Sequence, residues 1–507
     1  MPPQVRAARE EELRDAIFHV DPVKLTTLQS QIRETLVSAI LSGQIPADAP
    51  VPSTRLMAQR LRVSRNTVTL AYQTLAMDGF LTPRERSGFY VSKDLVSIPS
   101  REAPQNIRPG ANRSTDAHGQ NFDLAKRLRI KPSMQANVEK PENWHDYPFP
   151  FIYGQSDPAL FPIAEWRDCM RQAMSRKWLD AWTDDRFTAD DPMLIEQIRQ
   201  RLLPRRGIQA GTDEILVTLG AQNALYILAS LLVKPGAAVG LEDPGYPDFR
   251  NIIALKTANV RPLEIDGEGL VVDEQLSGCE LVFVTPSHQS PTNVTMSISR
   301  RRALLDWAAT AGAIIIEDDY EFETNYLGQA APALKSLDAN GRVVYVGSLS
   351  KSLMPGLRMG FMVGPPNLIR EARALRRLML RHPPGNNQRV VALFIAMGHH
   401  DMLVGKLHRA YRSRWHAMKA AMESCFPGWA QSPSFGGTSY WVTAPKGFDS
   451  ITLAERALEH GVVIEPGAIC FANPAGRSNH FRLGFSSLPA ERIGPGIEIL
   501  AQVAAQL

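Results

Sequence analysis

Lys351 is the clearest candidate for chemistry in this sequence, because it directly follows a predicted buried strand. The apolar run Val343 to Val346 precedes it, and the surrounding stretch, residues 348–360, is SLSKSLMPGLRMG. An amine in this position can attack the aldehyde of pyridoxal phosphate if desolvation and neighbouring positive charge lower its pKa. A lysine after Gly-Ser-Leu-Ser is more often a solvated loop residue, so the interpretation depends on its neighbours.

Further polar residues follow other predicted strands. From residue 151 onward, apolar runs that end in polar residues or glycine alternate with helical patterns, which predicts an α/β domain. Ligands in open α/β sheets bind at the carboxyl ends of the strands, so residues distant in sequence are expected to converge there. The runs lie at 214–222, 238–247, 281–291, 313–321 and 342–351, and the converging residues are Gly220, Ala221, Gln222, Tyr246, Ser287, His288, Asp318, Tyr320, Ser348 and Lys351.

This set contains partners for the ring of pyridoxal phosphate. Asp318 can accept a hydrogen bond from the pyridine nitrogen and keep it protonated, which makes the ring an electron sink. Tyr320, two residues later, points to the same side and can reach the phenolic oxygen. Tyr246 can stack on the ring. Asp-Asp-Tyr and DPGYP (243–247) are also ordinary turn sequences, so neither motif decides the matter alone.

Residues suited to the phosphate group are present as well. Gly220-Ala221-Gln222 opens a predicted helix, whose free N–H groups can bind an anion. Ser348, Ser350 and Arg358 add hydroxyl groups and a cation that can bind bidentately. Because these features occur in one order at successive strand ends, chance assembly is improbable. The sequence therefore predicts a pyridoxal phosphate site.

The arrangement resembles the fold-type-I aminotransferases, which implies their large α/β fold and pyridoxal 5'-phosphate as cofactor. By the matching motifs, Lys351 would be the aldimine lysine, Asp318 the partner of the pyridinium and Arg358 a phosphate ligand. Arg482, in NHFRLGFS, falls where that family binds the substrate carboxylate. It lies at the C-terminal end of a β-prone run, where a ligand-facing cation is expected.

Two departures from the aminotransferase pattern bear on activity. The family's Asn-Pro-Thr-Gly is replaced by Ser290-Pro291-Thr292-Asn293, so the asparagine that hydrogen-bonds the ring oxygen is absent. His288 or Gln289 is the candidate replacement. The glycine-rich Tyr-Gly-x-Pro-x-Gly turn is replaced by TADDPML, residues 188–194. A domain that keeps its Schiff-base lysine but lacks these residues is expected to bind amines better than it turns them over.

The N-terminal part of the chain shows a different pattern. Apolar residues recur every four positions from Leu28 to Ile40 before a glycine, which predicts an amphipathic helix. Ser53 and Ser64 are placed to cap a second and a third helix. The stretch FLTPRERSGFYV, residues 80–91, then predicts a β-hairpin. The module is therefore predicted to be a helix-turn-helix followed by a wing.

Basic and polar side chains of this module are suited to DNA. Side chains at the N-terminal end of the third helix reach base edges in such modules, and arginines at the tip of a wing can contact phosphate or the minor groove. A small helical bundle that docks onto a protein is the alternative, but the basic wing favours DNA. The predicted DNA-binding residues are Ser53, Arg55, Ser64, Arg65, Asn66, Thr67, Thr69, Arg84, Arg86 and Gly88.

The stretch from residue 51 to 91 resembles the winged helix of the GntR regulators. It contains VPSTRLMA, VSRNTV and GFLTPRERSGFYV, close to motifs of that family. By this match Arg55, Arg65, Thr67 and Gly88 occupy DNA-facing or wing positions. Phe89 and Tyr90 stand where the family has a smaller pair, which is expected to alter the wing.

Length and composition agree with a multidomain globular protein. A chain of 507 residues, with 44% hydrophobic and 21% charged residues, predicts two or three domains. The four cysteines show no paired metal spacing, the N-terminus lacks the apolar stretch of a signal peptide, and the longest apolar run is too short for a membrane span. A cytoplasmic protein with neither a metal site nor a membrane segment is expected.

The predicted divisions are 22–92 (winged helix), 93–122 (flexible linker) and 123–507 (effector domain), and no structure is assigned to 121–150.

The combination of the two resemblances is typical of the MocR-type regulators. It implies a transcriptional regulator that binds an operator in double-stranded DNA, forms head-to-tail homodimers and senses an amine or amino acid through an external aldimine at Lys351. The stretches PGYPDFRNI and SHQSPTNVTM resemble the taurine-responsive branch, and Arg482 favours an amine with a carboxylate or sulfonate. Two alternatives remain open: an active aminotransferase with a DNA-binding tether, and a regulator of vitamin B6 synthesis that senses pyridoxal phosphate itself.

Overall fold

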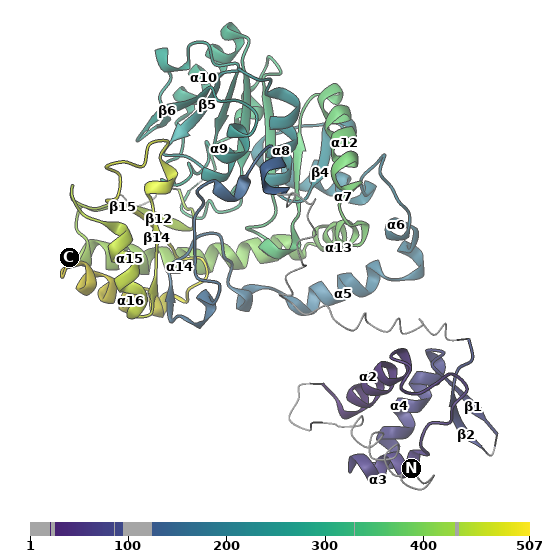
Figure 1. The fold of residues 1–507 in the computed structure, drawn as a ribbon. Coiled ribbons are helices and arrows are strands. Elements are labelled where there is room, and N and C mark those ends of the chain that lie inside the picture. Colours follow the sequence, from purple (N-terminus) through teal and green to yellow (C-terminus); the bar gives the residue numbers. More distant parts are fainter. Residues whose placement is uncertain (1–20, 22–25, 86, 95–123, 329, 431–434) are drawn as a thin grey trace, which may run out of the picture. The chain divides into compact units, whose positions relative to one another are not determined.

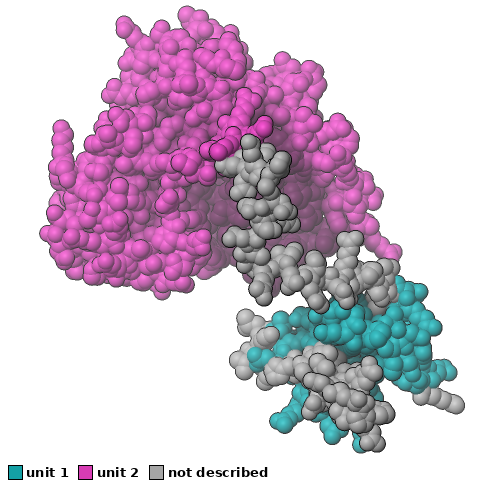
Figure 2. Space-filling model, viewed as in Figure 1, with its two compact units in different colours: residues 1–123 teal, residues 124–507 magenta. Residues whose placement is uncertain are grey.

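The chain forms two compact units, residues 1–123 and 124–507 (Figure 2). The structure is a computed structural model that describes residues 21, 26–85, 87–94, 124–328, 330–430 and 435–507. Except for its first two residues, the predicted linker lies outside the described residues, and so does Arg86 of the predicted wing.

The described part of the N-terminal unit contains three helices and a hairpin, as the sequence predicts. They are α2 (Leu28–Leu41), α3 (Thr54–Leu61), α4 (Arg65–Met77), β1 (Leu81–Arg84) and β2 (Gly88–Val91) (Figure 1). The helices share one core, in which Met57, Val68 and Tyr72 are fully buried. Ser53 Oγ accepts a hydrogen bond from Leu56 N at 3.2 Å and so caps α3.

An eight-stranded sheet forms the centre of the large unit. Its order is β4-β11-β10-β9-β8-β5-β6-β7, and the five strands that the sequence predicts all run in one direction. The strands are β4 (Ile215–Thr218), β5 (Val239–Asp243), β6 (Val260–Asp266), β7 (Gly269–Leu270), β8 (Leu281–Val284), β9 (Ile314–Asp319), β10 (Val343–Ser348) and β11 (Gly360–Val363).

Strands β6, β7 and β11 are not among the five predicted strands, and of these β11 bears on the site. It follows β10 after residues 349–359, which are too few for a crossover helix, so it pairs antiparallel with β10 and with β4. The connection between β10 and β11 carries Lys351 and Arg358. Both residues therefore lie at the edge where the parallel strands end.

Helices cover both faces of this sheet (Figure 1). One face packs against α8 (Ala221–Leu232), α9 (Pro247–Ala254) and α12 (Pro366–Leu380). The other packs against α10 (Ile298–Ala311), α11 (Leu334–Leu337) and the group formed by α5 (Ile163–Ala173), α7 (Pro192–Gln197) and α13 (Gly385–Ala396), with α6 (Asp180–Thr183) beside α13. Because both faces are covered, all residues of β4, β8, β10 and β11 are buried.

A smaller α/β layer follows the long helix α14 (His399–Cys425). It contains the sheet β12-β15-β14, made of Ser439–Thr443, His480–Gly484 and Glu465–Pro466, with α15 (Ser450–Glu459) and α16 (Ala490–Ala504). The N-terminal segment of the unit joins this layer, since β3 (Phe149–Pro150) pairs with β13 (Val462–Val463).

Within the described chain, no single helix is long and apolar enough to cross a membrane. The pair α13 and α14, bent by 75°, passes that test by length and composition only.

Candidate functional site

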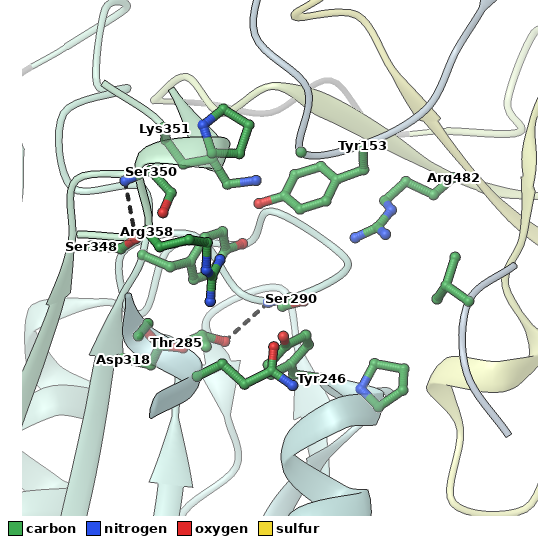
Figure 3. A pocket seen from close by; sticks show the side chains of 17 residues that line it. Tyr153, Tyr246, Thr285, Ser290, Asp318, Ser348, Ser350, Lys351, Arg358 and Arg482 are labelled. Atoms are coloured by element: carbon green, nitrogen blue, oxygen red, sulfur yellow. Dashed lines mark hydrogen bonds between the residues drawn. The ribbon is translucent and has the colours of Figure 1, made fainter. Parts of the chain in front are cut away.

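A cavity of about 250 Å³ opens at the carboxyl ends of the parallel strands (Figure 3). Of the twelve residues predicted to bind the cofactor or the ligand, ten line this cavity. Gly220 and His288 do not. The lining residues are Val138, Tyr153, Gly154, Ala221, Gln222, Tyr246, Pro247, Thr285, Ser290, Asp318, Tyr320, Ser348, Ser350, Lys351, Pro355, Arg358 and Arg482.

Lys351 projects into this cavity from the connection after β10. Its Nζ lies 3.9 Å from the centroid of the Tyr153 ring. Desolvation lowers the pKa of Lys351 to about 8, and the positive charge of Arg482 acts in the same direction. Roughly a tenth of this amine is therefore neutral, and so nucleophilic, at pH 7, far more than for a solvated lysine.

Asp318 occupies the end of β9 with an unsatisfied acceptor. The side chain is 3% exposed, and its Oδ1 has no hydrogen-bond partner among the described residues. Burial raises its pKa to about 8, and the nearby carboxylates of Asp319 and Glu242 add to the shift. A protonated ring nitrogen would supply the missing donor and a positive charge, so this residue fits the pyridine of pyridoxal phosphate.

The opposite end of the cavity is suited to a phosphate group. Gly220 precedes α8 with φ +79°, and a Cβ on it would lie 3.2 Å from Arg358 Nη2. A Cβ on Gly360 would lie 2.8 Å from Gly220 Cα, so Gly360 is required by close backbone approach, whereas Gly220 is favoured by its positive φ. Arg358 donates to Leu219 O at 3.1 Å. The N-terminus of α8 and the Arg358 guanidinium thus converge where an anion can bind.

The donors beside the phenolic position differ from those proposed from sequence. The ring of His288 is buried away from the cavity lining, and its main-chain oxygen accepts from Tyr320 OH at 2.9 Å. The Gln289 amide donates to Pro244 O at 2.8 Å and to Ser290 O at 2.8 Å. The structure therefore brings neither side chain to the cavity in place of the missing asparagine. Ser290 itself lines the wall instead.

Arg482 lies on the far side of Tyr153 from the phosphate end. It is in the middle of β15, not at the end of the run as the sequence suggested. Its Nε donates to Glu465 Oε2 at 2.8 Å, and this carboxylate raises the pKa of Arg482 above its usual range. Neither terminal nitrogen of the guanidinium has a hydrogen-bond partner among the described residues, and Figure 3 shows this group directed into the cavity. The two free nitrogens can bind a carboxylate or sulfonate bidentately.

Several lining residues were missed from the sequence. Val138 comes from residues 121–150, to which the sequence assigned no structure, and Tyr153 and Gly154 follow shortly after them, where only the adjacent Tyr-Gly hints at a close backbone approach. A Cβ on Gly154 would lie 3.0 Å from Lys351 Nζ. Thr285 Oγ1 donates to the buried Glu242 at 2.6 Å and accepts from Ser290 N at 3.0 Å, which fixes the wall beside Asp318.

The N-terminal unit presents the predicted DNA-facing residues at one end of α4. Arg55, Ser64, Arg65 and Asn66 are exposed, whereas Thr67 and Thr69 are half-buried. The hydroxyls of this group make local contacts: Ser64 Oγ accepts from Thr67 N at 3.1 Å, and Thr69 Oγ1 donates to Arg65 O at 2.9 Å. The exposed basic and amide side chains of this group are Arg55, Arg65 and Asn66, of which Arg65 also makes a local contact, since its Nε donates to Thr54 Oγ1 at 3.4 Å.

The wing is shaped by its two aromatic residues. Phe89 packs edge-on against Tyr72, with ring centroids 5.4 Å apart. The guanidinium of Arg84 lies 3.9 Å from the Tyr90 ring centroid and forms an ion pair with Asp48. Gly88 adopts φ +98° at the start of β2, which supports the expected role of a glycine in the turn.

Comparisons with known proteins agree with this two-part organisation. The family described as aminotransferase class I and II matches residues 171–500, and the bacterial regulatory proteins of the gntR family match residues 28–91. The HTH-type transcriptional regulator TauR of Rhodobacter capsulatus is 42% identical, over 96% of this chain and 98% of the relative. The probable rhizopine catabolism regulatory protein MocR of Rhizobium meliloti is 31% identical, over 79% and 78%. The crystal structure of Pyrococcus horikoshii kynurenine aminotransferase in complex with PMP has a TM-score of 0.69 at 28% identity, and covers 75% of this chain and 98% of its own.

These matches confirm the predicted fold class, a winged helix-turn-helix joined to a fold-type-I aminotransferase domain. The aminotransferase relatives depend on pyridoxal phosphate, so the family implies this cofactor, and the gntR match implies binding to DNA. The similarity to TauR covers 96% of the chain and so extends across both units. The chain therefore belongs to the MocR-type branch of the GntR transcriptional regulators.

Proposed function

We propose that this protein is a cytoplasmic, pyridoxal phosphate-dependent transcriptional regulator that senses a small amine carrying an acid group. The observation that supports it best is the convergence, in one cavity, of a lysine with a pKa of about 8 and of two groups without hydrogen-bond partners among the described residues, namely a buried aspartate oxygen and the two terminal nitrogens of an arginine. On a chain with a winged helix, such a cavity is suited to ligand-dependent control of DNA binding.

The bound cofactor supplies an aldehyde carbon that bonds reversibly to amines and a ring that withdraws electrons. Asp318 holds the proton on the ring nitrogen, Arg358 and the α8 N-terminus bind the phosphate, and Lys351 contributes the resident amine. Arg482 orients the acid group of the effector, whose amine takes the place of Lys351. Lys351 and Arg482 both lie against the Tyr153 ring, so a change in either side chain would be felt at Tyr153 and at β15.

A β-amino sulfonate or a short amino carboxylate is the effector class that we favour. Arg482 offers one guanidinium to one acid group, and Glu465 already occupies its Nε. The 42% identity to TauR, together with the resemblance to the taurine-responsive branch, makes taurine the first compound to test.

The attachment of pyridoxal phosphate to Lys351 is expected to accelerate with pH only up to about 8. Below its pKa of about 8 the amine is protonated and cannot attack, and above it the neutral form is already dominant. Stopped-flow absorption of the bound cofactor, followed from pH 6 to 10, measures the profile. A rate that continues to climb toward pH 10 would indicate a solvated, ordinary lysine instead.

Arg65→Ala is expected to weaken operator binding and to reduce its salt dependence. Loss of one phosphate or base contact lowers affinity by about 1–3 kcal/mol, and a phosphate contact lowers the slope of log K against log salt by about one unit. Fluorescence anisotropy with labelled operator at several salt concentrations measures both. Arg33→Ala on α2, which removes the ion pair with Asp78 at the end of α4, is the matched control and should leave binding unchanged.

A head-to-tail homodimer is part of the proposal. The family plan implies it, and α12 leaves Leu378 84% exposed and Met379 43% exposed beside a groove that Arg358 also lines. Burial of these side chains against a second copy would place that copy next to the phosphate end of the cavity. Leu378→Glu should therefore give monomers in light-scattering measurements, and cofactor binding should weaken with the loss of the dimer.

The decisive experiment is an absorption titration of the protein with pyridoxal phosphate against taurine, β-alanine, γ-aminobutyrate and a set of α-amino acids. A stable shift of the cofactor band with one compound, without a keto product, supports the sensor. Conversion to the pyridoxamine form with turnover on a keto acid would establish an aminotransferase instead. A change in operator binding caused by the cofactor alone, with no response to amines, would establish a sensor of pyridoxal phosphate.

A further inference from the structure

The Lys351 amine extends toward an aromatic face inside the cavity. Nζ lies 3.9 Å from the centroid of the Tyr153 ring, and Figure 3 shows it directed at that ring. Backbone closes the space behind it, because a Cβ on Gly154 would lie 3.0 Å from Nζ. An ammonium group over an aromatic face at this distance is attracted by the ring quadrupole. The cavity therefore contains a place suited to a positively charged Lys351.

Tyr153 is fixed at both ends by buried glutamates. Its hydroxyl donates to Glu321 Oε1 at 2.9 Å, and its main-chain N donates to Glu465 Oε1 at 3.2 Å. Thr438 Oγ1 donates to the same Glu321 oxygen at 2.6 Å. The ring is thus held in its position beside Lys351 by contacts from two different parts of the large unit.

Glu321 retains one acceptor that the described residues leave unused. The side chain is 2% exposed, and Oε2 is buried without a hydrogen-bond partner among those residues. A buried carboxylate with an unpaired oxygen is costly unless a positive charge is nearby. Of the charged groups that favour the protonated form of Lys351, Glu321 acts most strongly.

We propose that Tyr153 and Glu321 together hold the Lys351 ammonium after an effector has taken its bond, and so set the affinity for the effector. The inference rests on the proposed function. It makes both residues positioning residues for the exchange, with the ring supplying an aromatic face and the carboxylate supplying the counter-charge.

When the effector replaces Lys351, no proton is released to water only if the freed lysine is held as an ammonium. The bond between the aldehyde carbon and Nζ breaks, and a bond from that carbon to the effector nitrogen forms. If the nitrogen joined to the cofactor carried one proton both before and after the exchange, the effector, entering as an ammonium, would give up two hydrogens and Nζ would gain two and end as an ammonium. If Lys351 instead ended as a neutral amine, one proton would be released to water for each effector bound.

Other charges also act on this lysine and must stay in place for a test. Arg482, whose guanidinium lies 4.1 Å from the centroid of the same Tyr153 ring, disfavours its ammonium form, whereas Glu465 and Asp318 favour it. Glu321 in turn interacts with a larger set of titratable groups, namely Tyr153, Tyr320, Tyr326, Tyr411, His288 and Lys351. Glu321→Gln removes one negative charge and keeps both the shape and the acceptor for Tyr153 and Thr438.

The test is titration calorimetry of the cofactor-loaded full chain at pH 7.0, in two buffers of different ionisation enthalpy. The probe is taurine, or the panel amine with the largest spectral shift in the wild type. We expect the wild type to release fewer than about 0.2 protons per effector, because a lysine with a pKa of about 8 stays charged at this pH. Glu321→Gln should release more than about 0.5 and bind the effector about tenfold more weakly.

Glu323→Gln is the matched control. Glu323 is a buried glutamate two residues further along the same segment, it pairs with His400, and it does not line the cavity. This variant should retain wild-type affinity and proton release. If Glu321→Gln binds the effector more weakly but releases no more protons than the wild type, Glu321 has only a structural role and the inference is overturned. Wild-type effector affinity and wild-type proton release in this variant would also overturn it.

A second pair of variants keeps the inference testable if Glu321→Gln does not fold. Tyr153→Phe retains the aromatic face and should keep proton release within about 0.2 of the wild type, whereas Tyr153→Leu removes that face and should increase it. Equal release by both variants would overturn the role of the ring. A wild type that ignores every amine in the panel would overturn the proposed function itself, which distinguishes that failure from the failure of this inference.

Discussion

Lys351→Ala is expected to abolish the amine-dependent change in operator binding. The variant lacks the only amine lining the cavity in the described residues, so the cofactor cannot be attached there, although Asp318, Arg358 and the α8 N-terminus can still hold it. The visible band of the attached cofactor should be absent, and the affinity for pyridoxal phosphate should fall by at least about tenfold. Absorption spectroscopy and an operator-binding assay with and without effector measure both effects.

Lys234→Ala is the matched control for this change. Lys234 is 71% exposed and pairs with Glu280 on the surface, so the variant should keep both the spectrum and the response. Retention of a normal effector response in Lys351→Ala would contradict the proposed function, because the amine would then act without displacing this lysine.

Asp318→Asn is expected to stabilise the cofactor-free protein while it weakens cofactor binding about a hundredfold. The raised pKa, about 8, means that folding disfavours the ionised carboxylate. This cost is absent below the unfolded pKa near 4, grows as the pH rises toward 8 and is fully present above it. The isosteric amide carries no such cost, but it has no negative charge with which to keep the ring nitrogen protonated. Thermal melting at pH 8.5 and fluorescence titration with pyridoxal phosphate measure the two effects.

The neighbouring Asp319 provides a control whose substitution is expected to change the stability of the fold in the opposite direction. Asp319 faces away from the cavity, where Arg206 Nε donates to its Oδ2 at 2.7 Å and Tyr345 OH donates at 3.0 Å. These partners lower the pKa of Asp319, so Asp319→Asn leaves the buried Arg206 without its counter-charge and should destabilise the fold by about 3 kcal/mol. A destabilised Asp318→Asn variant would contradict our account of the cavity.

The strand ends that carry the site could be predicted because their signals are local. An apolar run of four to six residues that ends at a polar residue indicates a buried strand, and the carboxyl ends of parallel strands share one edge. Asp318, Ser348 and Lys351 lie within or directly after such runs, and the structure places all three at the cavity. The N-caps Ser53 and Ser64 are equally local, since each contact spans three residues.

The remaining cavity residues depend on contacts that no local pattern encodes. Tyr153 reaches the site because Phe151 N donates to Val463 O and Gly484 N donates to Phe151 O, pairings that span more than 300 positions. His288 lies beyond the end of β8 at Val284, where strand alternation no longer specifies the direction of a side chain. Strand β11 does not end in polar residues, and its place in the sheet depends on pairing with the distant β4, so no local pattern indicated it.

Residues 124–154 determine where the effector unit must begin if it is transferred to another protein. The aminotransferase match begins at residue 171, yet Val138, Tyr153 and Gly154 form part of the cavity wall. Gln135 Nε2 also donates to Asn251 O at 2.9 Å, which ties this segment to α9. A fusion protein that joins this effector unit to a different DNA-binding domain must therefore keep the chain from Leu124 onward. A fragment trimmed to the family match would lose the aromatic wall against which Lys351 rests.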